Sequence, residues 1–174
     1  MEQIKTQVVH LIGIQLKNKT INEGGRSGID CGNLWQEFEQ QHISDRIPNK
    51  IGNAVYAVYY DYEGDHTGPF SYFIGCRVED GTEAPKGLAS LIIPGGNYIK
   101  LLAKGKMPVC VADIWKKIWA SDMKRNYGYD FEVYDDRSLG WSNAEIDIFV
   151  GHDSNEVPKP LNGNQVLVFQ RSLE

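Results

Sequence analysis

Short runs of apolar, aromatic and β-branched residues, separated by Gly, Pro, Asn and Asp, recur along the chain and predict strands joined by turns. Residues 7–18 (QVVHLIGIQLKN) form the first such run and are expected to make a central strand. The Gly-rich segment that follows, residues 22–28, is typical of a loop. Residues 54–62 and 70–78 then predict a hairpin, because the segment between them (EGDHTGP) consists mainly of turn-forming residues.

Two other segments show the 3.6-residue period of amphipathic helices. The first helix is expected from about residue 30 to residue 41, with Leu34, Trp35 and Phe38 as its apolar stripe. The second is expected over residues 108–121, where Pro108 suits the first turn. Its apolar residues at positions i, i+3, i+4, i+7 and i+8 are Val111, Ile114, Trp115, Ile118 and Trp119.

The second half of the chain repeats the order of the first. Residues 58–61 can be aligned with residues 132–135, and residues 72–75 with residues 148–151. In each half a helix that carries a Trp precedes a hairpin, which indicates an internal duplication of a strand–helix–strand–strand unit. The strands expected in the second half are residues 90–94, 97–103, 130–135 and 144–152.

One acidic residue occupies an unusual position in the predicted strand 130–135. Alternation along a strand places Glu132 and Tyr134 on one face and Phe131 on the other. In the internal alignment, Glu132 takes the position of Val58. Because burying an unpartnered carboxylate is unfavourable, this substitution indicates a site that positive charge or hydrogen-bond donors complete. The alternative is a Glu at a sheet edge that points to solvent.

Composition and charge exclude several classes of function. The chain has 174 residues, 41% of them hydrophobic, so it can bury a core; its net charge is −5, without the basic stripe that nucleic acids require. It contains neither a run of about 18 apolar residues nor a signal peptide, so we expect a cytoplasmic protein that does not enter a membrane. The three cysteines and four histidines lack metal-ligand spacing, and we expect neither a metal nor a cofactor.

Four motifs, in their order and spacing, resemble the GyrI-like effector-binding domain. They are residues 58–63 (VYYDYE), the pair Trp115 and Trp119 on the second helix, residues 131–134 (FEVY) and residues 145–150 (EIDIFV). This family includes the ligand-sensing domains of the Rob and BmrR transcription regulators and stand-alone proteins encoded on integron cassettes that bind cationic drugs. No helix-turn-helix segment accompanies the resemblance, so we expect no direct binding to nucleic acid.

The resemblance implies an α+β fold of two pseudo-symmetric halves, about residues 5–82 and 88–152. The halves share an antiparallel sheet, and the helices pack on that sheet. Residues 1–152 are then a single effector-binding domain. Residues 153–174 are a C-terminal extension, in which residues 165–170 could add an edge strand.

The resemblance also implies an aromatic pocket between sheet and helices that contains a Glu and binds lipophilic, cationic aromatic molecules. In this sequence the acid corresponds to Glu132. Aromatic faces attract cations, and apolar contact supplies the remaining affinity. The candidate wall consists of Tyr134, Tyr60, Trp115, Trp119, Phe73 and Phe149, with Trp35 as the counterpart in the first half. The alternative for each aromatic residue is an ordinary position in the core or at the sheet margin.

Two other functions are compatible with the sequence. Glu132 could act as the general base of a small-molecule hydrolase, although the sequence shows no GxSxG motif and no Cys/His pairing, and thus no nucleophile. The polar cluster at one hairpin end, residues 61–66, is more simply a solvated turn. The third possibility is a protein-interaction module such as a gyrase modulator, with a protein partner or a second copy of the chain.

Overall fold

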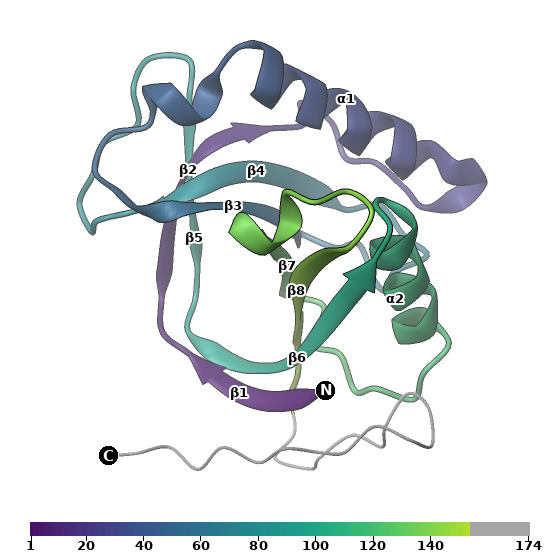
Figure 1. Ribbon diagram of the computed structural model, residues 1–174. Helices are drawn as coiled ribbons and strands as arrows, with labels where there is room; N and C mark the ends of the chain where they lie inside the picture. Colours follow the sequence, from purple (N-terminus) through teal and green to yellow (C-terminus); the bar gives the residue numbers. More distant parts are fainter. Residues whose placement is uncertain (154–174) are drawn as a thin grey trace.

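The structure, a computed structural model, describes residues 1–153. It confirms an α+β fold, in which two helices pack on a strongly curved, eight-stranded antiparallel sheet (Figure 1). The strand expected over residues 165–170 lies outside the described residues. The strands are β1 Glu2–Thr6, β2 Val9–Gln15, β3 Lys50–Tyr60, β4 Ser71–Val78, β5 Ala89–Ile93, β6 Gly96–Gly105, β7 Tyr129–Tyr134 and β8 Ala144–Gly151. The helices are α1 Arg26–Gln40 and α2 Val109–Trp119, and the 3₁₀ turns are η1 Glu23–Gly25, η2 Ile43–Arg46 and η3 Asp136–Ser138.

The order of the strands reflects the two halves of the chain. In the sheet the order is β1-β6-β8-β7-β3-β4-β2-β5, so β7 and β3, the third strands of the two halves, meet at the centre. Outward from each follow the fourth and then the second strand of the same half, and the outermost strand is the first strand of the other half. The first strand of each half pairs with the second strand of the other half, β1 with β6 and β5 with β2. This exchange joins the halves at both ends of the sheet, in addition to the β3–β7 pairing at its centre.

The N-terminal strand differs from the prediction. Residues 7–18 were expected to make one central strand, but the chain forms β1 and β2 with a break after Thr6. β2 lies beside the edge strand β5 and not at the centre. β1 has no clear hydrophobic run because it is itself an edge strand, and its Glu2, Gln3 and Lys5 are only partly buried or exposed.

Helix α1 begins earlier than its apolar stripe indicates. It starts at Arg26, directly after Gly25, whose φ of 72° suits glycine. Part of the Gly-rich segment expected to be a loop is therefore helical, including Gly28. Leu34 and Phe38 are buried beneath the helix, as the stripe predicted.

Each helix covers a hydrophobic core of its own half, and two tyrosines contact both cores. Leu34 and Phe38 of α1 pack on the first half of the sheet, and Ile118 of α2 packs on the second. Tyr59 of β3 and Tyr134 of β7 pack against both clusters. Among residues 1–153, neither helix is long and apolar enough to cross a membrane.

The position of each residue along the central strands decides which face its side chain covers. Ala57 and Tyr59 on β3, and Glu132 and Tyr134 on β7, face the helices. Val58 lies in the core on the opposite face of the sheet. The alignment of Glu132 with Val58 is therefore wrong, because a shift of one residue along a strand moves a side chain to the other face.

Candidate functional site

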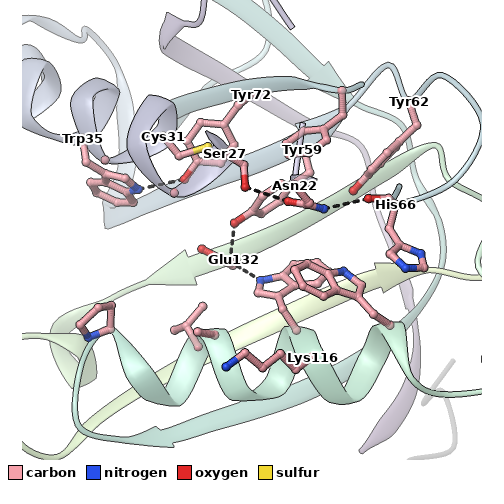
Figure 2. A pocket seen from close by; sticks show the side chains of 18 of the residues that line it. Asn22, Ser27, Cys31, Trp35, Tyr59, Tyr62, His66, Tyr72, Lys116 and Glu132 are labelled. Carbon is pink, nitrogen blue, oxygen red and sulfur yellow. Dashed lines mark hydrogen bonds between the residues drawn. The ribbon is translucent and has the colours of Figure 1, made fainter. Parts of the chain in front are cut away.

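A cavity of about 340 Å³ lies between α1 and α2, over the central strands of the sheet (Figure 2). Strands β3, β4 and β7 provide its floor, and the facing sides of the two helices provide its walls. This volume falls in the range of small-molecule sites, about 300–1,000 Å³. The lining is mainly apolar, and its larger side chains include Trp35, Tyr59, Tyr62, Phe70, Tyr72, Trp115, Trp119 and Tyr134.

Glu132 is the acidic residue of this cavity, and its side chain is held by three neutral donors. Its exposed fraction is 1%. The Tyr59 hydroxyl donates to Oε1 at 2.9 Å, and the Trp115 indole Nε1 donates to the same oxygen at 2.6 Å. The Tyr134 hydroxyl donates to Oε2 at 2.6 Å. The carboxylate is therefore fixed in orientation by groups from both halves of the chain, and Figure 2 shows it between the sheet tyrosines and α2.

Burial and hydrogen bonding act in opposite directions on this acid. Burial raises the pKa of Glu132 above its ordinary value, and the three hydrogen bonds from Tyr134, Trp115 and Tyr59 oppose that rise because they stabilise the charged form. Burial also raises the pKa of Tyr59 and of Tyr134 well above the usual range. Both phenols consequently remain protonated donors at neutral pH.

Aromatic rings surround the acid and contact one another across the two halves. Tyr59 lies 5.0 Å from Tyr72 and 5.0 Å from Trp115, measured between ring centroids. Trp35 lies edge-on to Tyr134 at 4.9 Å, and its Nε1 donates to the Tyr72 hydroxyl at 2.9 Å. These contacts hold the rings in place, so the wall of the cavity is formed before any ligand enters.

Helix α1 presents small residues to the cavity. Gly28, Cys31 and Gly32 have the i, i+3, i+4 spacing of one helix face, and all three line the cavity. A Cβ atom placed on Gly28 or Gly32 would have no heavy atom within 4 Å. The space between the helices therefore depends on the absence of side chains at these two positions. Burial raises the pKa of the Cys31 thiol to about 12, which keeps it protonated.

A second ionic group lies at another part of the lining. Arg125, which lines the cavity, pairs with Asp130 of β7 at 2.7 Å, and their side chains are 2% and 0% exposed. The Tyr62 hydroxyl donates to the same carboxylate at 2.7 Å. At the rim, the ring of Trp119 stacks on His66 with the ring centroids 5.7 Å apart.

The structure brings together five of the eight predicted site residues. Glu132, Tyr134, Trp115, Trp119 and Trp35 all line the cavity. Trp119 is 36% exposed and lies at the rim, whereas Trp115 is 7% exposed.

The other three predicted residues lie elsewhere, and their placement in the same wall was wrong. Phe73 is fully buried in the core on the opposite face of the sheet, and Phe149 stacks there on Phe131 at 4.6 Å. Tyr60 also points to that face, where its hydroxyl donates to Gln15 at 3.1 Å. The physical reason is the two-residue period of strands, which separates each of these residues from its helix-facing neighbour.

Several lining residues were not predicted from the sequence. Tyr59 and Tyr72 follow from the strand period once the helix-facing positions are known. The glycines of α1 share a spacing of four residues with each other, which is a signal for a helix face without side chains. Arg125 follows α2 in an irregular segment, and no local pattern marked it.

The apolar cavity between the helices and the duplicated α+β fold define an effector-binding domain. Residues 5–151 match the Cass2 family, described as integron-associated effector binding protein. The chain belongs to this family.

Two solved structures and one further sequence relative are similar to this chain. The integron cassette protein VCH_CASS2 of Vibrio cholerae is 26% identical, with a TM-score of 0.64 over 86% of this chain and 93% of that one. SAV2435, solved in complex with tetraphenylphosphonium, is 16% identical, with a TM-score of 0.65 over 85% of this chain and 90% of that one. YobU of Bacillus subtilis (strain 168), a candidate transcriptional regulator, is 25% identical over 121 residues, which are 67% of this chain and 76% of YobU.

Proposed function

We propose that residues 1–152 form one effector-binding domain whose pocket takes lipophilic, cationic aromatic molecules, with Glu132 as the counter-charge. The observation that carries this proposal is the environment of Glu132, a carboxylate that is 1% exposed in the lining of an aromatic cavity. Its three hydrogen bonds come from neutral groups, so the negative charge is stabilised without being neutralised. A cationic ligand supplies the missing half of an ion pair.

The aromatic wall favours a cation of diffuse charge. A ring face within about 6 Å of a cation contributes roughly 0.5–2 kcal/mol, with the larger values where water is excluded. Tyr59 and Tyr134 present their rings and hydroxyls at the acid itself, and Trp115 presents its ring and indole N–H. In support, the structurally similar SAV2435 is solved with tetraphenylphosphonium, a cation of this kind.

Binding is favoured over hydrolysis by the chemistry of the other lining residues. The thiol of Cys31 is protonated at neutral pH, because burial raises its pKa to about 12. The ring of His66 contacts Trp119 and the hydroxyl of Tyr127, which is not among the lining residues. These contacts do not pair His66 with a serine, threonine or cysteine nucleophile. The carboxylate oxygens of Glu132 already accept three hydrogen bonds, which leaves little acceptor capacity for a substrate water.

The decisive experiment compares two ions of the same shape and opposite charge. Tetraphenylphosphonium and tetraphenylborate each carry four phenyl rings around one atom. We expect tetraphenylphosphonium to quench the tryptophan fluorescence with saturation, and tetraphenylborate to bind at least about tenfold more weakly, which corresponds to about 1.4 kcal/mol. Equal affinity for the two ions would contradict a role for the buried charge.

A pair of isosteric substitutions assigns the charge to one residue. Glu132→Gln is expected to weaken tetraphenylphosphonium binding by about tenfold or more and to narrow the preference for the cation. Glu37→Gln, at an exposed position of α1, is the matched control and should leave the preference unchanged. If both variants retain the preference of the wild type, the cation is held by another part of the molecule.

A further inference from the structure

Two N–H donor atoms of Arg125 have no hydrogen-bond acceptor among residues 1–153. Its Nη2 donates to Asp130 at 2.7 Å and lies 3.4 Å from the Tyr62 hydroxyl. Its Nε and Nη1 are buried and have no hydrogen-bond partner, although the side chain lines the cavity and is 2% exposed. A buried donor without an acceptor costs roughly 1–3 kcal/mol, and more when the group is charged. An unsatisfied arginine beside a ligand cavity therefore indicates a position where a ligand supplies the acceptor.

Neighbouring groups account for only part of this deficit. The guanidinium carbon lies 4.4 Å from the ring centroid of Tyr127 and 5.7 Å from that of Tyr62, so the rings stabilise its charge. Asp130 accepts three hydrogen bonds, one at Oδ1 from the Gly151 amide at 2.8 Å and two at Oδ2 from Nη2 of Arg125 and the Tyr62 hydroxyl, and none comes from Nε or Nη1. The pair is neutral as a whole, and the N–H groups that it leaves free are directional donors.

The same indole connects this donor group with the acid of the pocket. Trp115 donates through Nε1 to Glu132 at 2.6 Å, and the guanidinium carbon of Arg125 lies 5.8 Å from its ring centroid. An aromatic ligand that contacts Trp115 can thus place one end near a carboxylate and the other near a guanidinium. Glu132 and Arg125 thus bring opposite charges to two parts of the lining, and a simple cation pairs only with Glu132.

We infer that Arg125 forms an acceptor subsite, and that the pocket is built for aromatic cations that also carry a carbonyl or carboxylate oxygen. This inference rests on the proposed function, because it places the cationic end of the ligand at Glu132. The oxygen accepts a hydrogen bond from either Nε or Nη1 of Arg125, which lie on different edges of the guanidinium, after a small displacement of the Tyr62 or Tyr127 ring. Recognition is then bipolar, and specificity depends on the separation of the two groups in the ligand.

The test uses three phosphonium ions that share one aromatic cation and differ at the end of one alkyl chain. They are pentyltriphenylphosphonium, (4-carboxybutyl)triphenylphosphonium and the methyl ester of the latter, titrated into the full chain at pH 7.5 by calorimetry. We expect the carboxylate to bind about tenfold more tightly than the pentyl compound, with the ester between them. If the pentyl compound binds as well as both oxygen-bearing compounds, the acceptor subsite is refuted while the cation site stands. If none of the three binds, the proposed function fails as well.

Two substitutions identify the donor. Arg125→Lys keeps the positive charge beside Asp130 but removes the Nε and Nη1 donors, and it should reduce the carboxybutyl-to-pentyl affinity ratio to within about twofold of one. Lys117→Met is the matched control, because Lys117 is a cation on the same helix as Trp115 but is exposed and lies outside the cavity lining. A ratio that persists in Arg125→Lys, or disappears in Lys117→Met, overturns the assignment to Arg125. The wild-type comparison holds even if one variant folds poorly.

Discussion

Glu132 lies directly opposite Ala57 in the central strand pair, and both side chains face the helices. Ala57 is fully buried, and its single methyl group leaves room beside the carboxylate for the ring of Tyr59, which follows two residues later on the same strand. The acid therefore sits where the two halves of the sheet meet, with a donor from β3 and two donors from the second half. This position gives one buried charge access to the rings of both halves.

The pH dependence of stability should report the ionisation of Glu132. Burial raises its pKa in the folded chain above the value in the unfolded chain, about 4.3, so the native state holds this proton more strongly. The free energy of unfolding gained from the protonated group is fully present below pH 4.3 and is lost as the pH rises through the raised pKa. Glu132→Gln does not lose free energy of unfolding in this way, because its amide does not ionise. Urea unfolding between pH 4 and pH 8 should show the variant gaining stability relative to wild type as the pH rises, and parallel curves would contradict this.

The donor from α2 should control how readily the acid ionises. Trp115→Phe removes the indole N–H that donates to Glu132 at 2.6 Å, so the pKa of Glu132 should rise further. As the pH is lowered, the affinity for tetraphenylphosphonium should then begin to fall at a higher pH than in wild type, because only the ionised acid attracts the cation. The measurement is the dissociation constant as a function of pH between 5 and 8.

Trp35→Phe provides the comparison for this change. It removes the same indole from the same cavity, but its N–H donates to Tyr72 at 2.9 Å rather than to the acid. As the pH is lowered, the affinity of Trp35→Phe for tetraphenylphosphonium should fall at the same pH as that of wild type. A shift of equal size in both variants would mean that the loss of aromatic contact, and not the loss of the donor, is responsible.

The sequence predicted the helices and hairpins well because their signals are local. The apolar period of α2 and the turn residues between β3 and β4 involve neighbours along the chain. The short, polar β1 was missed, since an edge strand needs only a weak hydrophobic pattern. Its exchange with the other half depends on long-range pairing, which no window of the sequence contains.

The candidate site was only partly predictable for a related reason. Glu132 and Tyr134 could be placed on one face from the strand period alone. The same period applies to Tyr60 and Phe73, but it does not tell which alternate residues of β3 and β4 face the helices. That choice, the parity of the strand, is fixed by the register of β3 with β7 and with β4. Choosing the wrong parity moved both residues from the core on the opposite face into the predicted wall. Arg125 depends entirely on tertiary packing.

The same substitution should have opposite effects at two glycines. Gly32→Ala adds a methyl group in open space on α1 and should stabilise the protein by about 0.5–1 kcal/mol, because alanine favours the helix. Gly13→Ala on β2 would bring its Cβ against the Ile74 carbonyl oxygen and the Gly75 backbone, and should destabilise the protein by more than about 3 kcal/mol. Thermal and urea unfolding of the two variants measure these effects.

Larger side chains at Gly32 should close the pocket without unfolding the protein. Gly32→Phe places a ring between the helices, so tetraphenylphosphonium binding should fall by more than about tenfold while the melting temperature stays near that of Gly32→Ala. Gln36→Phe, one turn later and outside the lining, is the control for an added ring on α1. Undiminished binding in Gly32→Phe would place the ligand outside this cavity.

The buried pair Arg125–Asp130 should matter far more for folding than an exposed pair of the same type. Asp130→Asn leaves the guanidinium buried without its counter-ion and should lower the free energy of unfolding by about 3–5 kcal/mol. Asp61→Asn breaks the ion pair with Lys19 at 3.2 Å, but the Asp61 side chain is 64% exposed, so solvent screens the pair and the loss should be much smaller. Urea unfolding at pH 7 distinguishes the two. Similar losses would mean that water reaches Arg125 in the folded protein, and its free N–H groups would then not be waiting for a ligand oxygen.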